Sequence, residues 1–327
     1  MGRMTHRERF ITALECKQPP GLVPHFELVF YLTMEAFGKV HPTHRTFGQW
    51  NQMSRSEKRA QLQDAARVYL MTAERYDHSA IFLHGAGAGM GPEEEERLID
   101  LVHHLGRGEY FLMIHGDATY GIPSGADMMA WCGRLVDDPQ GVKDEAKRMV
   151  DDALKRAERL RERTALDGFA LCADYCLNEG PFLSPAMFAE FVAPYLTRLI
   201  RGYREMGFYT IKHTDGNILP IIDQLVAAGP HALHSLDPQG GVDIAEVKRR
   251  YGHRVCLIGN VNCGLLDTGS DEEVIASARY CLRHGMPGGG YIFSTSNCIY
   301  TGMDLDRYHL ILDVWREEGW YDRAASG

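Results

Sequence analysis

The clearest chemical signal in the sequence is the pair His213 and Asp215, which are separated only by Thr214. Residues two apart on an extended segment project to the same side of the chain. An imidazole and a carboxylate in this arrangement can bind one metal ion, or the carboxylate can orient the histidine for proton transfer. A hydrogen-bonded histidine followed by a helix-capping aspartate gives the same pattern. The pair therefore indicates a chemical site and leaves its type open.

Two further residues, Cys298 and Glu27, carry groups that would complete a metal site with this pair. A thiolate, an imidazole and one or two carboxylates form an open zinc site that keeps one position for a substrate. The predicted Zn²⁺ ligands are therefore His213, Cys298, Asp215 and Glu27, and the predicted catalytic residues are His213, Asp215 and Asp174. The alternatives are an inert small residue at Cys298 and a salt-bridged or substrate-binding carboxylate at Glu27.

The sequence contains eight short apolar runs, and each is followed by a polar or glycine-rich break and then a helical pattern. The structural elements that these runs predict must position the residues named above. The runs cover residues 22–30, 79–83, 110–114, 168–172, 208–211, 232–236, 254–258 and 291–294. Near-continuous apolar strands that alternate with amphipathic helices are typical of a parallel sheet buried on both faces. Eight such units predict an α/β fold, a single-domain TIM (β/α)8 barrel over residues 1–327. An open doubly wound sheet would need a glycine-rich turn after the first strand, and no glycine follows Phe30 until Gly38.

Polar residues follow most of the predicted strands. In a barrel of this type, the chemistry takes place where the carboxyl ends of the strands run into loops. We therefore expect these residues to converge on one mouth around His213. The predicted substrate-binding residues at this mouth are Glu27, His115, Asn178, Glu179, Asp237 and Asn260.

The composition excludes several classes of function. The chain is 45% hydrophobic and 24% charged, which is ordinary for a globular protein, and its net charge of −9 disfavours nucleic-acid binding. The longest apolar stretches are strand-sized, well below the roughly 20 residues that cross a bilayer. Residues 1–10 are polar and charged and lack the apolar region of a signal peptide. We therefore expect a cytoplasmic protein without a nucleic-acid or membrane partner, whose eight cysteines form no disulfide framework.

Several stretches resemble the uroporphyrinogen decarboxylase superfamily, which also includes zinc-dependent methyltransferases that act with methylated corrinoids. The resemblance rests on residues 178–188, 191–195, 211–217, 257–261, 288–292 and 296–298. It covers roughly the whole chain in order and is most specific from Asn178 onward. The resemblance implies a TIM barrel, in agreement with the count of apolar runs.

The first apolar run departs from the haem-pathway decarboxylases of this superfamily. Those enzymes have an arginine-rich loop after the first strand that holds the carboxylates of the tetrapyrrole. Here the only Lys or Arg residues between Arg9 and Arg45 are Lys17 and Lys39. A multiply anionic substrate would be repelled by Glu27 in place of an arginine fork. This difference argues against the haem-pathway reaction itself.

The resemblance to the methyltransferase branch concerns the metal ligands. That branch has a His-x-Cys motif after the fifth strand and a further cysteine after the eighth, and these residues bind zinc. This sequence matches the motif at His213 and Cys298 but has Asp215 in the middle position. Zinc also accepts carboxylate ligands, so the substitution is compatible with zinc binding.

The resemblance therefore implies a zinc-dependent methyltransferase that acts with a methylcorrinoid and a small thiol, ether or amine. The chain has no Asp-x-His-x-x-Gly corrinoid motif, so the corrinoid would be free or bound to a separate partner protein. The superfamily also implies a possible homodimer. An alternative is a metal-free decarboxylase-like lyase that acts on a smaller acid, with His213 and Asp215 as the proton-transfer pair. A third is a barrel that binds a ligand or partner without catalysis.

Overall fold

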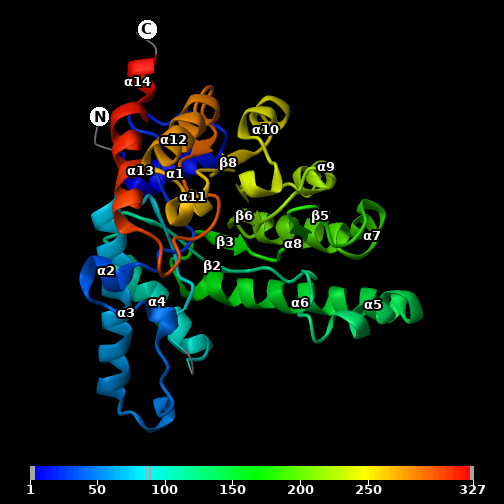
Figure 1. Cartoon of the computed structure of the whole chain (residues 1–327). Helices are drawn as coiled ribbons and strands as arrows, with labels where there is room; N and C mark the ends of the chain where they lie inside the picture. Colours follow the sequence, from blue (N-terminus) through cyan, green and yellow to red (C-terminus); the bar gives the residue numbers. More distant parts are fainter. Residues whose placement is uncertain (1–3, 86, 88–89, 325–327) are drawn as a thin grey trace.

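The computed structural model of the protein describes residues 4–85, 87 and 90–324. Helices and strands alternate along the chain as an α/β fold, and the long helices α3 and α6 extend beyond the sheet (Figure 1). The strands are β1 (Ala80–Phe82), β2 (Phe111–His115), β3 (Gly168–Leu171), β4 (Cys176–Leu177), β5 (Gly180–Pro181), β6 (Tyr209–Thr214), β7 (Ala232–Ser235), β8 (Cys256–Ile258) and β9 (Tyr291–Ile292). The α-helices are α1 (His6–Leu14), α2 (Thr33–Phe37), α3 (Arg55–Tyr76), α4 (Pro92–Leu105), α5 (Met128–Asp137), α6 (Pro139–Arg163), α7 (Pro185–Phe191), α8 (Ala193–Glu205), α9 (Ile222–Ala227), α10 (Ile244–Tyr251), α11 (Cys263–Thr268), α12 (Asp271–Gly285), α13 (Leu305–Glu318) and α14 (Tyr321–Ala324). Short 3-10 helices are η1 (Pro42–His44), η2 (Trp50–Gln52) and η3 (Pro238–Gly240).

Seven of the described strands form one parallel sheet in the order β1-β2-β3-β6-β7-β8-β9. The remaining two, β4 and β5, form a separate antiparallel hairpin in the loop after β3. The register of the sheet pairs His213 of β6 with His234 of β7. The predicted parallel sheet, built from strands that alternate with helices, is confirmed.

The first predicted strand is replaced by an extended segment with isolated bridges. Within residues 22–30, His25 bridges in parallel to His78 before β1 and to Phe293 after β9. Because both sheet edges reach one residue, the sheet is curled. Pro24 has no N–H to donate to a neighbouring strand, which is consistent with the irregular pairing. The structure thus shows a curled seven-stranded sheet, and the closed eight-stranded barrel of the prediction is confirmed only to that extent.

The apolar core has an inner and an outer layer relative to this curled sheet. Strand residues such as Met113, Ile211 and Ile258 form the inner layer together with Phe10 and Leu14 of α1. Alternate strand residues pack against the surrounding helices. Helix α1 contacts β1, β2 and β9, and its Arg7 binds Asp167, which directly precedes β3. Helix α1 therefore lies at the amino-terminal end of the strands, which leaves their carboxyl ends for a site.

Capping side chains fix where several helices begin. Ser54 before α3 and Ser270 before α12 each form a capping box with the glutamate three residues later. Replacing such a cap by alanine typically costs about 1 kcal/mol of helix stability. Ser184 likewise accepts a hydrogen bond from the N–H of Met187 at the start of α7. In the part of the chain that the structure describes, no helix is both long enough and apolar enough to cross a membrane.

Candidate metal and proton-transfer site

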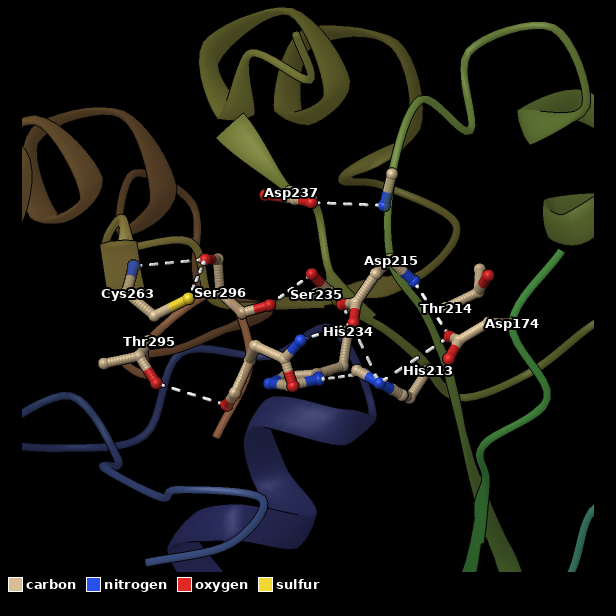
Figure 2. Close-up of polar contacts among 12 residues, drawn as sticks. Asp174, His213, Thr214, Asp215, His234, Ser235, Asp237, Cys263, Thr295 and Ser296 are labelled. Carbon is tan, nitrogen blue, oxygen red and sulfur yellow. Dashed lines mark hydrogen bonds and ion pairs between the residues drawn. The ribbon is translucent and has the colours of Figure 1, made fainter. Parts of the chain in front are cut away.

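The loop after β3 and the end of β6 bring Asp174, His213 and Asp215 together (Figure 2). Nε2 of His213 lies 3.8 Å from Oδ1 of Asp215 and 4.0 Å from Oδ1 of Asp174. One possible ligand atom of each residue lies within 4.8 Å of the other two. The backbone N–H of Asp215 donates to Oδ1 of Asp174 at 3.2 Å. The structure therefore places the three predicted catalytic residues within reach of one cation.

The two carboxyl oxygens of Asp215 have different surroundings. Oδ2 accepts a hydrogen bond from the side-chain amide of Asn297. Oδ1 is buried and accepts no hydrogen bond of ordinary geometry from the described residues. The hydroxyl of Ser235 donates to the carbonyl of Ser296, and it also acts on the carboxyl group of Asp215, whose pKa it lowers. Burial raises the pKa of Asp215 to about 7, and the charge of Asp174 adds to the shift. A proton or a metal ion at Oδ1 would relieve this unfavourable environment.

A second histidine, His234 of β7, supports the ring of His213 from the side opposite the carboxylates. The two Nδ1 atoms lie 2.8 Å apart, and both side chains are almost fully buried. Burial lowers the pKa of His213 to about 4 and that of His234 well below its ordinary value. Near neutral pH both rings are therefore neutral, and one of them donates its N–H to the other. His234 was not predicted as a site residue; its one signal is a histidine inside the apolar run 232–236.

Glu27 lies in its own buried set of hydrogen bonds with Ser294 and Thr295. Its carboxyl group accepts from the hydroxyl and the N–H of Thr295, the latter at 3.2 Å from Oε2, and from the hydroxyl of Ser294 at 3.3 Å. Burial outweighs these hydrogen bonds and raises the pKa of Glu27 to about 8. Glu27 is not in the group of close ligand atoms. The structure therefore does not bring it to His213 as a direct ligand.

Cys298 is also absent from that group. It is partly buried, and burial together with the carboxyl groups of Asp215 and Glu27 raises the pKa of its thiol far above the ordinary value. The predicted set of His213, Cys298, Asp215 and Glu27 thus differs from the observed group of Asp174, His213 and Asp215.

A buried ion pair behind His213 holds the loop that carries Asp174. Nζ of Lys212 lies 2.8 Å from Oδ2 of Asp117 and also donates to the carbonyls of Leu171 and Ala173, at 3.1 and 2.8 Å. The same Oδ2 of Asp117 accepts the N–H of Ala173 at 2.9 Å. Both backbone groups of Ala173, the residue before Asp174, are therefore fixed. Lys212 was not predicted as a site residue; its one signal is a lysine inside an apolar strand.

The other predicted substrate-binding residues have diverse positions. His115 ends β2, and its Nε2 lies 2.9 Å from Nδ1 of His84. Asn178 and Glu179 are exposed at the turn of the β4–β5 hairpin. Asp237 caps η3 and accepts the N–H of Gly216 at 3.2 Å (Figure 2). Asn260 is buried and donates to the carbonyls of Leu236 and Val242, at 2.7 and 3.2 Å. Asp237 and Asn260 thus hold the loops around the mouth.

The second half of the chain is similar to known uroporphyrinogen decarboxylases. A family model described as uroporphyrinogen decarboxylase (URO-D) matches residues 167–318, from just before β3 to the end of α13. A curated uroporphyrinogen decarboxylase from Thioalkalivibrio sulfidiphilus (strain HL-EbGR7) is 29% identical over 150 residues, which is 43% of this chain and 40% of that protein. One from Shewanella loihica (strain ATCC BAA-1088 / PV-4) is 28% identical over 135 residues, 38% of this chain and 35% of that protein. The predicted resemblance to the uroporphyrinogen decarboxylase superfamily is confirmed.

The matches differ in how much of the chain they cover. The alignments span about two fifths of the length of these curated decarboxylases. The region matched by the uroporphyrinogen decarboxylase family contains Asp174, His213 and Asp215 but not Glu27 or His115. A solved structure of a methyltransferase from Methanosarcina mazei superposes with a TM-score of 0.71 at 15% identity, over 96% of this chain and 99% of that one. This likeness shows a shared fold over nearly the whole of both chains.

Proposed function

We propose that this chain is a zinc-dependent methyltransferase that acts with a methylcorrinoid and a small thiol, ether or amine. The observation that carries the proposal is the convergence of Asp174, His213 and Asp215, with one buried oxygen of Asp215 that accepts no hydrogen bond of ordinary geometry from the described residues. The overall likeness to the Methanosarcina mazei methyltransferase supports the same choice. The corrinoid would arrive free or on a separate protein.

The chemistry of the three side chains fits a divalent cation. One imidazole nitrogen and two carboxylate oxygens are accepted by zinc and leave a position for a substrate. His213, Asp174 and Asp215 would hold the ion, with Glu27 and Cys298 outside the set. When bound, zinc favours the thiolate form of a thiol and polarises the heteroatom of an ether or amine.

The side chains around the site have separate tasks in this proposal. In the metal-free protein, burial raises the pKa of Asp215 to about 7, and in the metal-bound protein this carboxylate would serve as a ligand. Asn297 holds the other oxygen of this carboxyl group. Asp174 has a side chain that is 49% exposed, so it faces the solvent side from which a substrate enters. The His213–His234 contact keeps the imidazole in place.

A metal-free decarboxylase-like lyase acting on a smaller acid is the alternative. The names of the curated relatives favour it, and so does the titration of Asp215 beside His213, since a general acid works best with a pKa near the operating pH. Such an enzyme would keep its activity in the presence of a chelator and would show a bell-shaped pH–rate profile.

Metal analysis of the purified full-length chain tests the proposal. We expect about one equivalent of zinc after incubation with zinc and dialysis, as in other single-ion sites. Asp215→Ala should reduce this content sharply, whereas Asp152→Asn, which changes an exposed aspartate on α6, should not. A zinc content below about a tenth of an equivalent would exclude the zinc-dependent reaction. Loss of the methyl–cobalt absorption of methylcobalamin on adding a small thiol would then measure the transfer itself.

A further inference from the structure

A chain of buried polar side chains connects Glu27 to the site through both histidines. Oε2 of Glu27 lies 3.3 Å from Oγ of Ser294, and this Oγ lies 3.5 Å from Nε2 of His234. Nδ1 of His234 lies 2.8 Å from Nδ1 of His213. The last atom of the chain is Nε2 of His213, which faces the two site carboxylates (Figure 2). All four residues are buried, so bulk water does not compete for these contacts.

The hydrogen bonds from Glu27 to His213 can all point in one direction or all in the other, because a neutral imidazole carries one N–H and one lone pair. When Glu27 carries a hydrogen, it donates to Ser294, Ser294 donates to Nε2 of His234, and Nδ1 of His234 donates to Nδ1 of His213. The hydrogen of His213 then lies on Nε2 and points at the site carboxylates. When Glu27 is ionised, every bond of the chain reverses, and Nε2 of His213 presents a lone pair.

We propose that Glu27 is a positioning residue that sets, from a distance, which tautomer His213 presents to the site. The lone-pair form is the one that can bind a divalent cation or accept a proton, and the N–H form can only donate. In the conversion to the lone-pair form, a proton leaves Nε2 of His213 for a site carboxylate or solvent. Each hydrogen behind it moves along one bond, and Glu27 is left ionised. Both imidazoles stay neutral throughout.

The environment of Glu27 makes both directions accessible near neutral pH. Burial raises the pKa of Glu27 to about 8 and lowers that of His213 to about 4, so a proton on this chain resides on the carboxyl group. The N–H of Thr295 is a fixed donor to Glu27, and the Thr295 hydroxyl has the carbonyl of Asn297 as a second acceptor at 3.2 Å. The other titratable groups that interact with Glu27 are Cys263, Cys298, Tyr291 and Tyr308, all neutral because burial raises their pKa.

The link between Ser294 and His234 is the weakest point of the hydrogen-bond chain. The contact between Ser294 and His234 is the longest in the chain, at 3.5 Å. The backbone of Thr295 also accepts from the ring of His234, which opposes the lowering of its pKa by burial. The inference depends on the proposed function only in taking His213, Asp174 and Asp215 as the site.

Nitrogen NMR of the metal-free, full-length chain with ¹⁵N-labelled histidine tests the inference, and a His213→Asn spectrum assigns the signal. At about pH 6.5 we expect His213 to carry its hydrogen on Nε2, and at about pH 9.5 on Nδ1. The ratio of the two forms should change about tenfold per pH unit as Glu27 titrates. Glu27→Gln keeps an amide donor toward Ser294, so it should hold the Nε2–H form at both pH values. Glu35→Gln, which changes an exposed glutamate of α2, should behave like the wild type.

Asp215 also titrates near neutral pH, and the Glu27→Gln variant separates the two effects. If that variant still changes tautomer with pH, or if the wild type does not change, the inference is wrong. Ser294→Ala should remove the coupling, with circular dichroism showing that the chain folds. As a second readout, Glu27→Gln should bind zinc at least about tenfold more weakly, a typical effect of losing an outer partner of a ligand. The NMR measurement uses neither metal nor substrate, so its failure is distinct from a failure of the proposed function.

Discussion

Two aspartates, Asp167 and Asp117, whose side chains are only 8% and 10% exposed, bind cationic side chains at opposite ends of the same parallel sheet. At the amino-terminal end, Oδ1 of Asp167 accepts from Nε of Arg7 at 2.8 Å, and its Oδ2 accepts the N–H of Leu112 at 2.9 Å. At the carboxyl-terminal end, Asp117 accepts from Lys212 at 2.8 Å. The side chain of Arg7 is 40% exposed, whereas that of Lys212 is fully buried.

The two pairs differ in what they hold. Arg7 and Asp167 join α1 to the sheet, where no candidate site residue lies. Lys212 and Asp117 together bind both backbone groups of Ala173, next to Asp174. We infer that the first pair contributes mainly to stability, and that the second pair also positions the site. Loss of a partner in a closed pair leaves a charge without water, so the second pair should be the more sensitive.

The largest effect is expected from Lys212→Met. This variant leaves Asp117 buried without its counter-charge, which typically costs about 3–5 kcal/mol of unfolding free energy. Because the backbone at Ala173 loses a donor, zinc binding should also fall. Urea unfolding and zinc titration measure the two effects.

The double variant Lys212→Met with Asp117→Leu is the control for the buried charge. Removing both charges should restore most of the lost stability, because replacing a buried ion pair by apolar residues is often close to neutral. Zinc affinity should stay low, since the fixed position of Ala173 is not restored. If the unfolding free energy of Lys212→Met lies within about 0.5 kcal/mol of the wild-type value, the buried ion pair does not stabilise the protein in this way.

Asp215→Asn should stabilise the metal-free protein at high pH. Burial raises the folded-state pKa of Asp215 to about 7, above the unfolded value of roughly 4, so the folded state loses stability as the pH rises from about 4 to 7. The asparagine variant does not pay this cost, so its gain should grow over that range to at most about 4 kcal/mol. Urea unfolding of chelator-treated protein at pH 5 and pH 8 measures it.

The same substitution at the other end of the sheet should have the opposite sign. Asp167→Asn removes the charge that Arg7 binds, so it should destabilise the protein at both pH values. If Asp215→Asn also destabilises the metal-free protein at pH 8, burial of the ionised Asp215 carboxylate does not lower the stability of the folded state. Loss of zinc binding in this variant is expected in either case.

The alternation of strands and helices could be predicted because the spacing of apolar residues and the capping residues of helices are features of the local sequence. The exception is the segment around His25, where an apolar run forms isolated bridges and not a strand. Apolar character alone does not distinguish a strand from an extended segment packed between two sheet edges. Pro24 was the one residue in that run that indicated irregular pairing.

The same limit of local sequence applies to the prediction of the site residues. His213 and Asp215 could be predicted as a pair because their spacing fixes a common side of one strand. His234 could not, because its contact depends on the register between β6 and β7, which is set by packing far from either residue. Cys298 was assigned to the metal from the position of its strand, but the direction of its side chain depends on the loop after β9. Glu27 was predicted as a ligand, and its buried contacts to Ser294 and Thr295 suggest an indirect role.

Arg7→Met tests the other half of the comparison and should have the smallest effect. The cationic side chain is 40% exposed, and Asp167 keeps the N–H of Leu112 as a donor, so the expected cost is about 1 kcal/mol. Zinc affinity and the tautomer of His213 should be unchanged, because the pair touches no group near the site. Urea unfolding and zinc titration of this variant, beside Lys212→Met, provide the comparison. If Arg7→Met lowers zinc affinity as far as Lys212→Met does, the effect of the lysine is general loss of stability and not positioning of Asp174.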